Sequence, residues 1–202
     1  LWYSNTNGLR MEPVMDTAPT LNCGSVFVDW KSGMILVGTG EINSSRSSYA
    51  GIGLLQSFDK GKTWKNIGLT DSHHISKILV NPKNSQEIVV GVAGHLYTKN
   101  KERGVFKTTD GGKSWQQVLF VNDETGVIDM AVAESNFTVM YASAWQKDRK
   151  AHNFNGNGKA SGIYKSTDAG STWQLISTPE SGFPSDEFVG RIGLSAFTSD
   201  II

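Results

Sequence analysis

The sequence has almost no cysteine, no excess of charge and no long apolar run. Cys23 is the only cysteine in the 202 residues, which excludes an internal disulfide and any cysteine-based zinc cluster. The 19 Lys and Arg residues balance 19 Asp and Glu residues without forming a basic cluster, so nucleic acid is not an expected partner. The longest apolar runs, at 34–38 and 87–94, are far shorter than the roughly 20 residues that cross a bilayer, so we expect no membrane span.

Glycine and tryptophan, by contrast, are abundant. The chain contains 22 Gly and 6 Trp, and charged residues make up only 19% of it. This balance is typical of all-β proteins with many tight turns. The composition therefore favours an all-β fold.

A motif of the form S/T-x-D-x-G-x-S/T-W recurs along the chain. Three copies match it fully, at residues 57–64, 108–115 and 166–173. A decayed copy at 4–11 has Thr6 in the Asp position and Met11 in the Trp position. The regular recurrence, about every fifty residues, indicates an internal repeat.

Each motif lies between two short alternating runs, which predicts a hairpin with the motif in its turn. The Asp carboxylate can accept hydrogen bonds from turn amides, the Gly can take a positive φ, and the Trp can bury a large apolar face. We therefore assign a structural role to the Asp and Trp of each box. These residues are Asp59, Trp64, Asp110, Trp115, Asp168 and Trp173.

Two further apolar strands precede each hairpin, which makes four strands per repeat. Four strands in about fifty residues is the pattern of a β-propeller blade. We predict a single propeller fragment over 1–202, with full blades at 23–70, 71–122 and 123–183 and partial blades at 1–22 and 184–202. The pattern at 189–197 matches only the first strand of a further blade. Further blades would come from a longer chain or another subunit; a closed four-bladed ring is the alternative.

The chain resembles the Asp-box (BNR repeat) propellers, which include sialidases, xyloglucan-cleaving glycosidases and sortilin-type ectodomains. It is most similar to bacterial secreted BNR-repeat or sortilin-like glycosyl hydrolases. The segments that carry this likeness are 35–41, 74–84, 93–115, 141–146 and 190–194. The resemblance implies a carbohydrate-related role and a secreted or periplasmic location.

The candidate site lies on the face opposite the Asp boxes. The loops between second and third strands, at 42–50, 95–103 and 147–160, are long and polar, as binding loops usually are. Glu41, His95 and Trp145 lie at one level where these loops begin. Glu41 could act as an acid or base and Trp145 could stack on a sugar ring; alternatively, Glu41 and His95 only tie down their own loops.

The first strands give a second set of candidates. Their apolar patterns align Ser25, Lys77, Asp129 and Arg191 at equivalent positions. Asp129 would then lie between two cations, which favours the ionised carboxylate. It could serve as a nucleophile or base, with Lys77 or Arg191 orienting an anionic substrate. The alternative is a set of salt bridges between blades.

Histidines add a weaker signal. His73 and His74 precede a first strand on the same face as His95, but the spacing fixes no third ligand, so we predict no metal and no cofactor. His74 and Arg103 remain candidates for substrate binding.

Two functions follow from these patterns. One is a glycoside hydrolase with two carboxylates about 5 to 9 Å apart, drawn from Glu41, Asp129 and Glu102. The other is a non-catalytic propeller that binds a protein, peptide or glycan through exposed aromatic residues. The aromatic candidates are Tyr49, Tyr97, Trp145 and Phe154.

Overall fold

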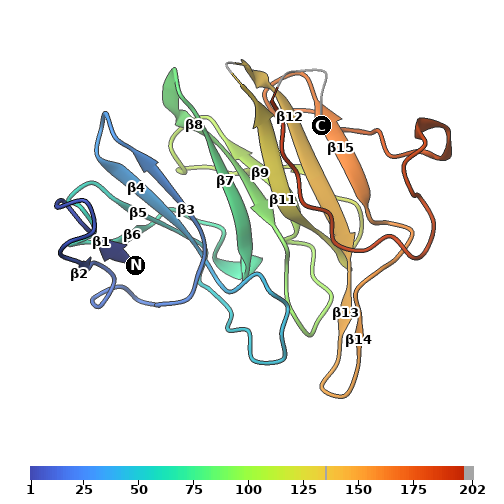
Figure 1. Cartoon of the computed structure of the whole chain (residues 1–202), viewed down its shortest axis with the longest axis horizontal. Helices are drawn as coiled ribbons and strands as arrows, with labels where there is room; N and C mark the ends of the chain where they lie inside the picture. The colour runs from blue at the N-terminus through green and yellow to red at the C-terminus, as the bar shows by residue number, and fades with distance from the viewer. Residues whose placement is uncertain (135, 198–202) are drawn as a thin grey trace.

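Three four-stranded antiparallel sheets stand side by side (Figure 1) in the computed structural model, which describes residues 1–134 and 136–197. The first sheet contains β3 (Cys23–Asp29), β4 (Met34–Thr39), β5 (Leu54–Ser57) and β6 (Lys65–Asn66). The second contains β7 (Ile75–Asn81), β8 (Asn84–Val92), β9 (Gly104–Thr108) and β10 (Gln116–Leu119). The third contains β11 (Thr125–Ala133), β12 (Asn136–Gln146), β15 (Gly162–Ser166) and β16 (Gln174–Leu175).

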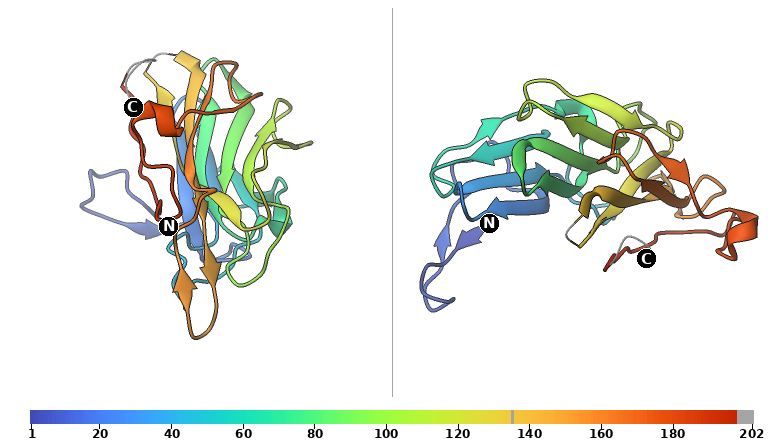
Figure 2. Two further views of the ribbon diagram at one scale, coloured as in Figure 1. Left: turned by 90° about the vertical axis from the view of Figure 1, so that its right-hand side faces the viewer. Right: turned by 90° about the horizontal axis from the view of Figure 1, so that it is seen from above.

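The sheets are the blades of a partial β-propeller. Seen from above in Figure 2, they fan out along an arc, with the N-terminal hairpin at one end and the C-terminal segment at the other. The first strands of neighbouring sheets, β3, β7 and β11, contact each other, as the inner strands of a propeller do. The predicted all-β propeller fold is confirmed.

Burial follows the position of each strand in its blade. The second strand β4 is a continuous apolar run that is buried along its whole length, because a neighbouring layer covers each of its faces. The outer strand β6 is fully exposed. The apolar run at 34–38, too short for a membrane, is therefore the centre of a blade.

Two apolar layers hold the three blades together. Because successive side chains of a strand point to opposite faces, β8 directs Ile88 and Val90 into the layer beside the first sheet and Val89 into the layer beside the third. Trp115 packs against the first of these layers, and its Nε1 donates a hydrogen bond to the Ile67 carbonyl at 2.7 Å. Trp115 thus ties its blade to the preceding one.

The Asp-box turns satisfy their own polar groups. Asp59 accepts hydrogen bonds from the Thr63 amide at 2.9 Å and the Thr63 hydroxyl at 2.6 Å, while Ser57 Oγ accepts one from the Gly61 amide at 2.9 Å. Gly61 has a φ of 82°, a value that glycine adopts without strain. The Thr63 hydroxyl and amide and the Ser57 hydroxyl lower the pKa of Asp59 to about 2. The boxes at Asp110 and Asp168 repeat these contacts.

The decayed copy keeps part of this pattern in a hairpin of β1 (Trp2–Tyr3) and β2 (Glu12–Pro13). Ser4 Oγ accepts a hydrogen bond from the Gly8 amide at 2.9 Å, and Thr6 Oγ1 accepts one from the Arg10 amide at 2.8 Å. A threonine hydroxyl therefore takes over part of the role of the missing Asp carboxylate. Beyond this hairpin, the Val14 carbonyl receives Trp64 Nε1 at 2.9 Å, as Ile67 receives Trp115.

The predicted strand at 189–197 is wrong. These residues form no strand in the part of the chain that the structure describes, because no partner strand lies beside them to build a ladder. They instead bond to the third blade, where the Leu194 amide donates to Asp129 Oδ2 at 3.0 Å and the Ile192 carbonyl accepts from Ser143 Oγ at 2.9 Å.

The long loops gather at one edge of the sheets, the lower edge in Figure 1. The hairpin of β13 (Asp148–Arg149) and β14 (Phe154–Asn155) extends from this edge. Two 3₁₀ helices, η1 (Thr70–Ser72) and η2 (Pro179–Ser181), complete the elements. Among residues 1–134 and 136–197, no helix has the length and apolarity needed to span a membrane.

Candidate functional site

The long loops of three blades bond to one another and form one surface, which we call the loop face. Arg149 of β13 donates from Nε and Nη2 to the Ser44 carbonyl, at 3.0 and 2.7 Å. Tyr97 donates its hydroxyl to the Arg46 carbonyl at 2.8 Å. The loop of the first blade is thereby held by the loops of the second and third.

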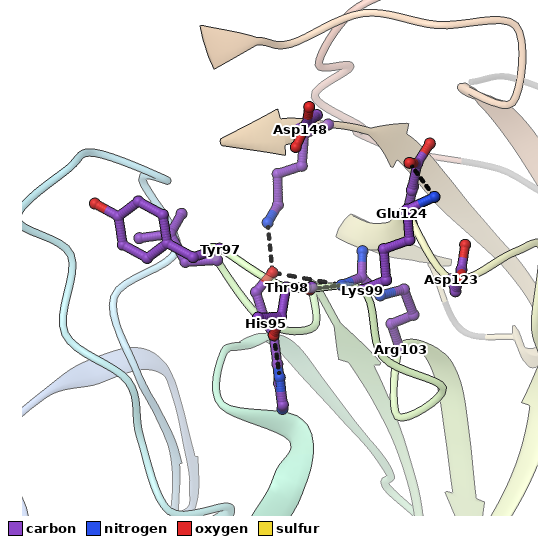
Figure 3. A pocket seen from close by; sticks show the side chains of 10 residues that line it. His95, Tyr97, Thr98, Lys99, Arg103, Asp123, Glu124 and Asp148 are labelled. Atoms are coloured by element: carbon purple, nitrogen blue, oxygen red, sulfur yellow. Dashed lines mark hydrogen bonds and ion pairs between the residues drawn. The ribbon is translucent and has the colours of Figure 1, made fainter. Parts of the chain in front are cut away.

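A pocket of about 150 Å³ opens in this face (Figure 3). Its walls come from the 95–103 loop of the second blade, from the residues just before β11 and from those just after β12. The lining residues are His95, Leu96, Tyr97, Thr98, Lys99, Arg103, Asp123, Glu124, Lys147 and Asp148. The pocket is therefore built from two adjacent blades and is rich in charged groups of both signs.

Two buried cations form the base of the pocket. The Arg103 side chain is 1% exposed and donates to the backbone carbonyls of Asn100, Thr98 and His95. Lys147 is 6% exposed, and its Nζ donates to the His95 carbonyl at 3.3 Å. Burial, with added repulsion from Arg103 and Arg149, lowers the pKa of Lys147 to about 7. At the rim, Lys99 pairs with Glu124 at 2.7 Å.

His95 connects the pocket to a cluster at η1. Its Nδ1 lies 2.8 Å from Thr98 Oγ1, and its ring stacks on His73 at a centroid distance of 3.6 Å. Asp71 Oδ1 lies 3.4 Å from His95 Nε2 and 3.8 Å from His73 Nε2. Asp71, His73 and His95 are the residues that could hold a metal ion here, with all three donor atoms within 4.8 Å of one another. Sequence spacing did not single out Asp71, although it stands only two residues before His73.

The first strands place Ser25, Lys77 and Asp129 at equivalent positions. Each residue directly follows a β-bulge in its strand, and the three pair with Gly38, Gly91 and Ser143 of the respective second strands. Lys77 Nζ lies 3.3 Å from Asp129 Oδ1, which makes an ion pair between blades. Arg191 instead lies over the Trp145 ring, at 5.9 Å from its centroid.

Both proposed catalytic carboxylates take part in local structure. Glu41 Oε2 accepts the Tyr49 amide at 3.3 Å, and the Glu41 amide donates back to the Tyr49 carbonyl at 3.0 Å. Asp129 accepts the Met130 amide on Oδ1 and the Leu194 amide on Oδ2, in addition to its pairing with Lys77. These contacts correspond to the loop-tying and salt-bridging alternatives.

Three candidate binding residues are buried and cannot offer an open surface to a ligand. Trp145 is 5% exposed because its ring packs with Ala93 and Ile128 and its Nε1 donates to the Gly156 carbonyl at 2.7 Å. His74 is 3% exposed, and the Arg103 guanidinium donates hydrogen bonds to backbone carbonyls of its own loop. The expected sugar platform at Trp145 is therefore wrong. Tyr49, Tyr97 and Phe154 remain accessible.

Unsatisfied polar atoms also collect near the loop face. Within the described residues, the buried side-chain atoms that lack a hydrogen-bond partner are Ser72 Oγ, His74 Nδ1 and Thr125 Oγ1. All three lie at or just before the start of a first strand. Burial, with repulsion from Lys147 and His73, lowers the pKa of His74 to about 4 and keeps its ring neutral.

Comparisons with known proteins agree with this architecture. The profile of the Sortilin-Vps10 family, described as sortilin and neurotensin receptor 3, matches residues 53–184. An ancestral GH74 enzyme is 26% identical, with a TM-score of 0.53 over 78% of this chain and 18% of that one. A GH74 enzyme from Niastella koreensis is 20% identical, with a TM-score of 0.52 over 77% of this chain and 21% of that one. The chain thus spans about a fifth of the length of these enzymes. No functionally curated protein matches it significantly.

Proposed function

The chain belongs to the Sortilin-Vps10 family, and we propose that its loop face binds a carbohydrate ligand. The observation that carries the proposal is the pocket at His95, whose lining includes both an exposed aromatic residue, Tyr97, and the exposed carboxylate of Asp123. A sugar presents hydroxyl groups to carboxylates and C–H faces to aromatic rings.

Binding is better supported than hydrolysis by the residues of this chain. A retaining or inverting glycosidase needs two carboxylates free to act on the glycosidic bond. Glu41 is engaged by the Tyr49 amide, and both Asp129 oxygens are engaged by backbone amides. We therefore assign Glu41 and Asp129 to the support of the loop face.

The test is a glycan-binding measurement, by array and then by calorimetry, on the native chain and three variants. Tyr97→Ala and Asp123→Ala are each expected to weaken binding about tenfold, the loss of one good contact. Lys113→Ala, on an exposed Asp-box turn, is the matched control and should bind like the native chain. Binding of a peptide alone, or glycan binding that both loop variants retain, would overturn the proposal.

A second candidate is a glycoside hydrolase, favoured by the 26% identity to the ancestral GH74 enzyme. A reducing-end assay with the glycans that bind would detect turnover. If Glu41→Gln or Asp129→Asn abolishes that turnover while binding persists, hydrolysis replaces simple binding as the function.

We further propose that additional blades, from a longer chain or another subunit, complete the ligand site. Val26 and Trp30 on the first sheet are 50% and 84% exposed, a larger apolar exposure than on a blade with two neighbours. A secreted or periplasmic location is proposed from the family resemblance. Cell fractionation of the native host would test it.

A further inference from the structure

Three side chains from two segments of the chain converge at η1. Asp71 lies in the 3₁₀ helix, His73 follows it, and His95 comes from the loop after β8. We propose that Asp71, His73 and His95 form a binding site for a divalent transition-metal ion such as Zn²⁺, with an open coordination position toward the loop face. The spacing of the donor atoms, the contacts that orient the rings and the unusual backbone of His73 support this site.

The donor spacing is close to that of a metal centre. Zinc binds imidazole nitrogens and carboxylate oxygens at about 2.0 to 2.2 Å in tetrahedral geometry, which places neighbouring donors about 3.3 Å apart. Asp71 Oδ1 lies 3.4 Å from His95 Nε2 and 3.8 Å from His73 Nε2. These two spacings are within about half an ångström of that value.

Thr98 orients the His95 ring. Thr98 Oγ1 lies 2.8 Å from His95 Nδ1, and the Asp71 carbonyl oxygen lies 3.0 Å from His95 Nε2. A carbonyl oxygen only accepts, so Nε2 carries the ring hydrogen here and Thr98 donates to Nδ1. A metal ion on Nε2 requires the other tautomer, in which Nδ1 donates to Thr98 Oγ1 and the Nε2 lone pair is free for the ion. Metal-ligating histidines are commonly fixed by such a contact on the second ring nitrogen.

The backbone and surroundings of His73 are unusual as well. Its φ is 57° with ψ of −39°, a combination outside the left-handed helical region that non-glycine residues with a positive φ usually occupy. The next residue, His74, has a buried Nδ1 without a hydrogen-bond partner among the described residues, and its ring lies edge-on to His73 at 6.4 Å. The segment thus maintains strain and an unsatisfied polar atom beside the three donors.

Metal binding must change the stacked pair. The His73 and His95 rings are 15° from parallel, so their nitrogen lone pairs run side by side. An ion shared by both rings requires the ring planes to turn toward it. The proposal therefore predicts that the metal separates the stack, which gives a structural readout independent of affinity.

The donor set also selects the ion. Imidazole nitrogens suit Zn²⁺, Co²⁺, Ni²⁺ and Cu²⁺, whereas Ca²⁺ and Mg²⁺ prefer oxygen ligands. Three protein ligands leave a fourth position free, the arrangement of zinc sites that bind an exogenous group.

The experiment is a calorimetric titration of the purified chain with Zn²⁺, with Ca²⁺ as the comparison ion. One Zn²⁺ per chain is expected to bind, and Ca²⁺ to bind much more weakly. Asp71→Asn, His73→Gln and His95→Gln should each weaken Zn²⁺ binding by at least about tenfold, and Thr98→Val by about tenfold. His152→Gln, an exposed histidine on another loop, is the matched control and should leave binding unchanged.

A second measurement keeps the proposal falsifiable if a variant fails to fold. NMR of the ring protons in the unaltered chain should show that Zn²⁺ shifts the signals of His73 and His95 and leaves His152 unaffected. Absence of one-to-one binding, equal loss in the His152 control, or ring signals that move only for other histidines would overturn the site.

Discussion

The two faces of the molecule satisfy their polar groups in different ways. On the Asp-box face the carboxylate of each box bonds to residues no more than four apart, as between Asp59 and Thr63, while Trp64 and Trp115 add one bond each to the preceding segment. On the loop face they join residues far apart in sequence, such as His95 to Asp71 across 24 positions and Arg149 to Ser44 across 105. The Asp-box turns are held by local hydrogen bonds, whereas the loop face depends on how the blades are placed relative to one another.

This difference separates stability from function. A turn that satisfies its own groups can recur with every blade, because its contacts do not depend on the neighbouring loops. The loop face leaves buried polar atoms unpaired at His74 and Thr125 and keeps a buried lysine, Lys147, against a pocket. Unpaired buried groups destabilise a fold, and they concentrate where ligands act. We therefore expect substitutions on the two faces to have separable effects.

The largest expected effect comes from Trp115→Ala, which removes the Asp-box contact between the first two blades. The variant loses the packing of the ring on the inter-blade layer and the hydrogen bond to Ile67, so we expect about 3 kcal/mol lower free energy of unfolding. Urea denaturation followed by tryptophan fluorescence and circular dichroism measures this. Trp30→Ala is the control, because Trp30 is 84% exposed and its removal should change stability by less than about 0.5 kcal/mol. Equal losses in both variants would contradict the structural role of the Asp-box tryptophan.

The fold could be predicted from sequence because its signals are local and repeated. The motif at 57–64 is enough to predict its turn, and the alternating residues around it are enough to predict the hairpin. Neither prediction requires knowledge of distant residues. The same register placed Lys77 and Asp129 at equivalent positions, where the structure finds an ion pair. The strand predicted at 189–197 was wrong because the apolar pattern of this segment is that of a first strand, whereas a strand also requires a partner strand to pair with.

The site could be predicted only in part, because it depends on contacts between loops. Trp145 carries the same sequence signal whether its ring is open or packed, and the 154–156 segment that covers it comes from its own blade's long loop. Asp71 and His95 lie close together because two separate segments of the chain meet there, and no rule of sequence spacing predicts such a meeting. Lys147 ends an apolar strand, and only the three-dimensional packing shows that its amine is buried.

A smaller effect is expected from Asp59→Asn, and it should appear in how the stability of the fold depends on pH. Because the hydroxyl and amide donors hold the pKa of Asp59 at about 2 in the folded state, below its ordinary 3.8, the carboxylate stabilises the fold above about pH 4. That contribution is lost as the pH falls from about 4 to about 2. The Asn variant should therefore be less stable than the native chain at neutral pH and lose less stability over this acid range. Thr63→Val, which removes one donor and keeps the charge, should fall between the two. Identical acid profiles for the native chain and Asp59→Asn would show that the box does not hold the carboxylate.

The smallest effect is expected from Tyr97→Phe on the loop face. The change removes one neutral hydrogen bond, to the Arg46 carbonyl, from a side chain that is 49% exposed, so we expect a loss of about 0.5 kcal/mol. The global free energy of unfolding should hardly change, because the blade layers are untouched. Amide hydrogen exchange in the 42–50 loop should nevertheless accelerate, since that loop loses one of its ties to the second blade. If Tyr97→Phe instead destabilised the whole chain as much as Trp115→Ala does, the loop face would contribute to global stability as the Asp-box face does. The proposed difference between the two faces would then be wrong.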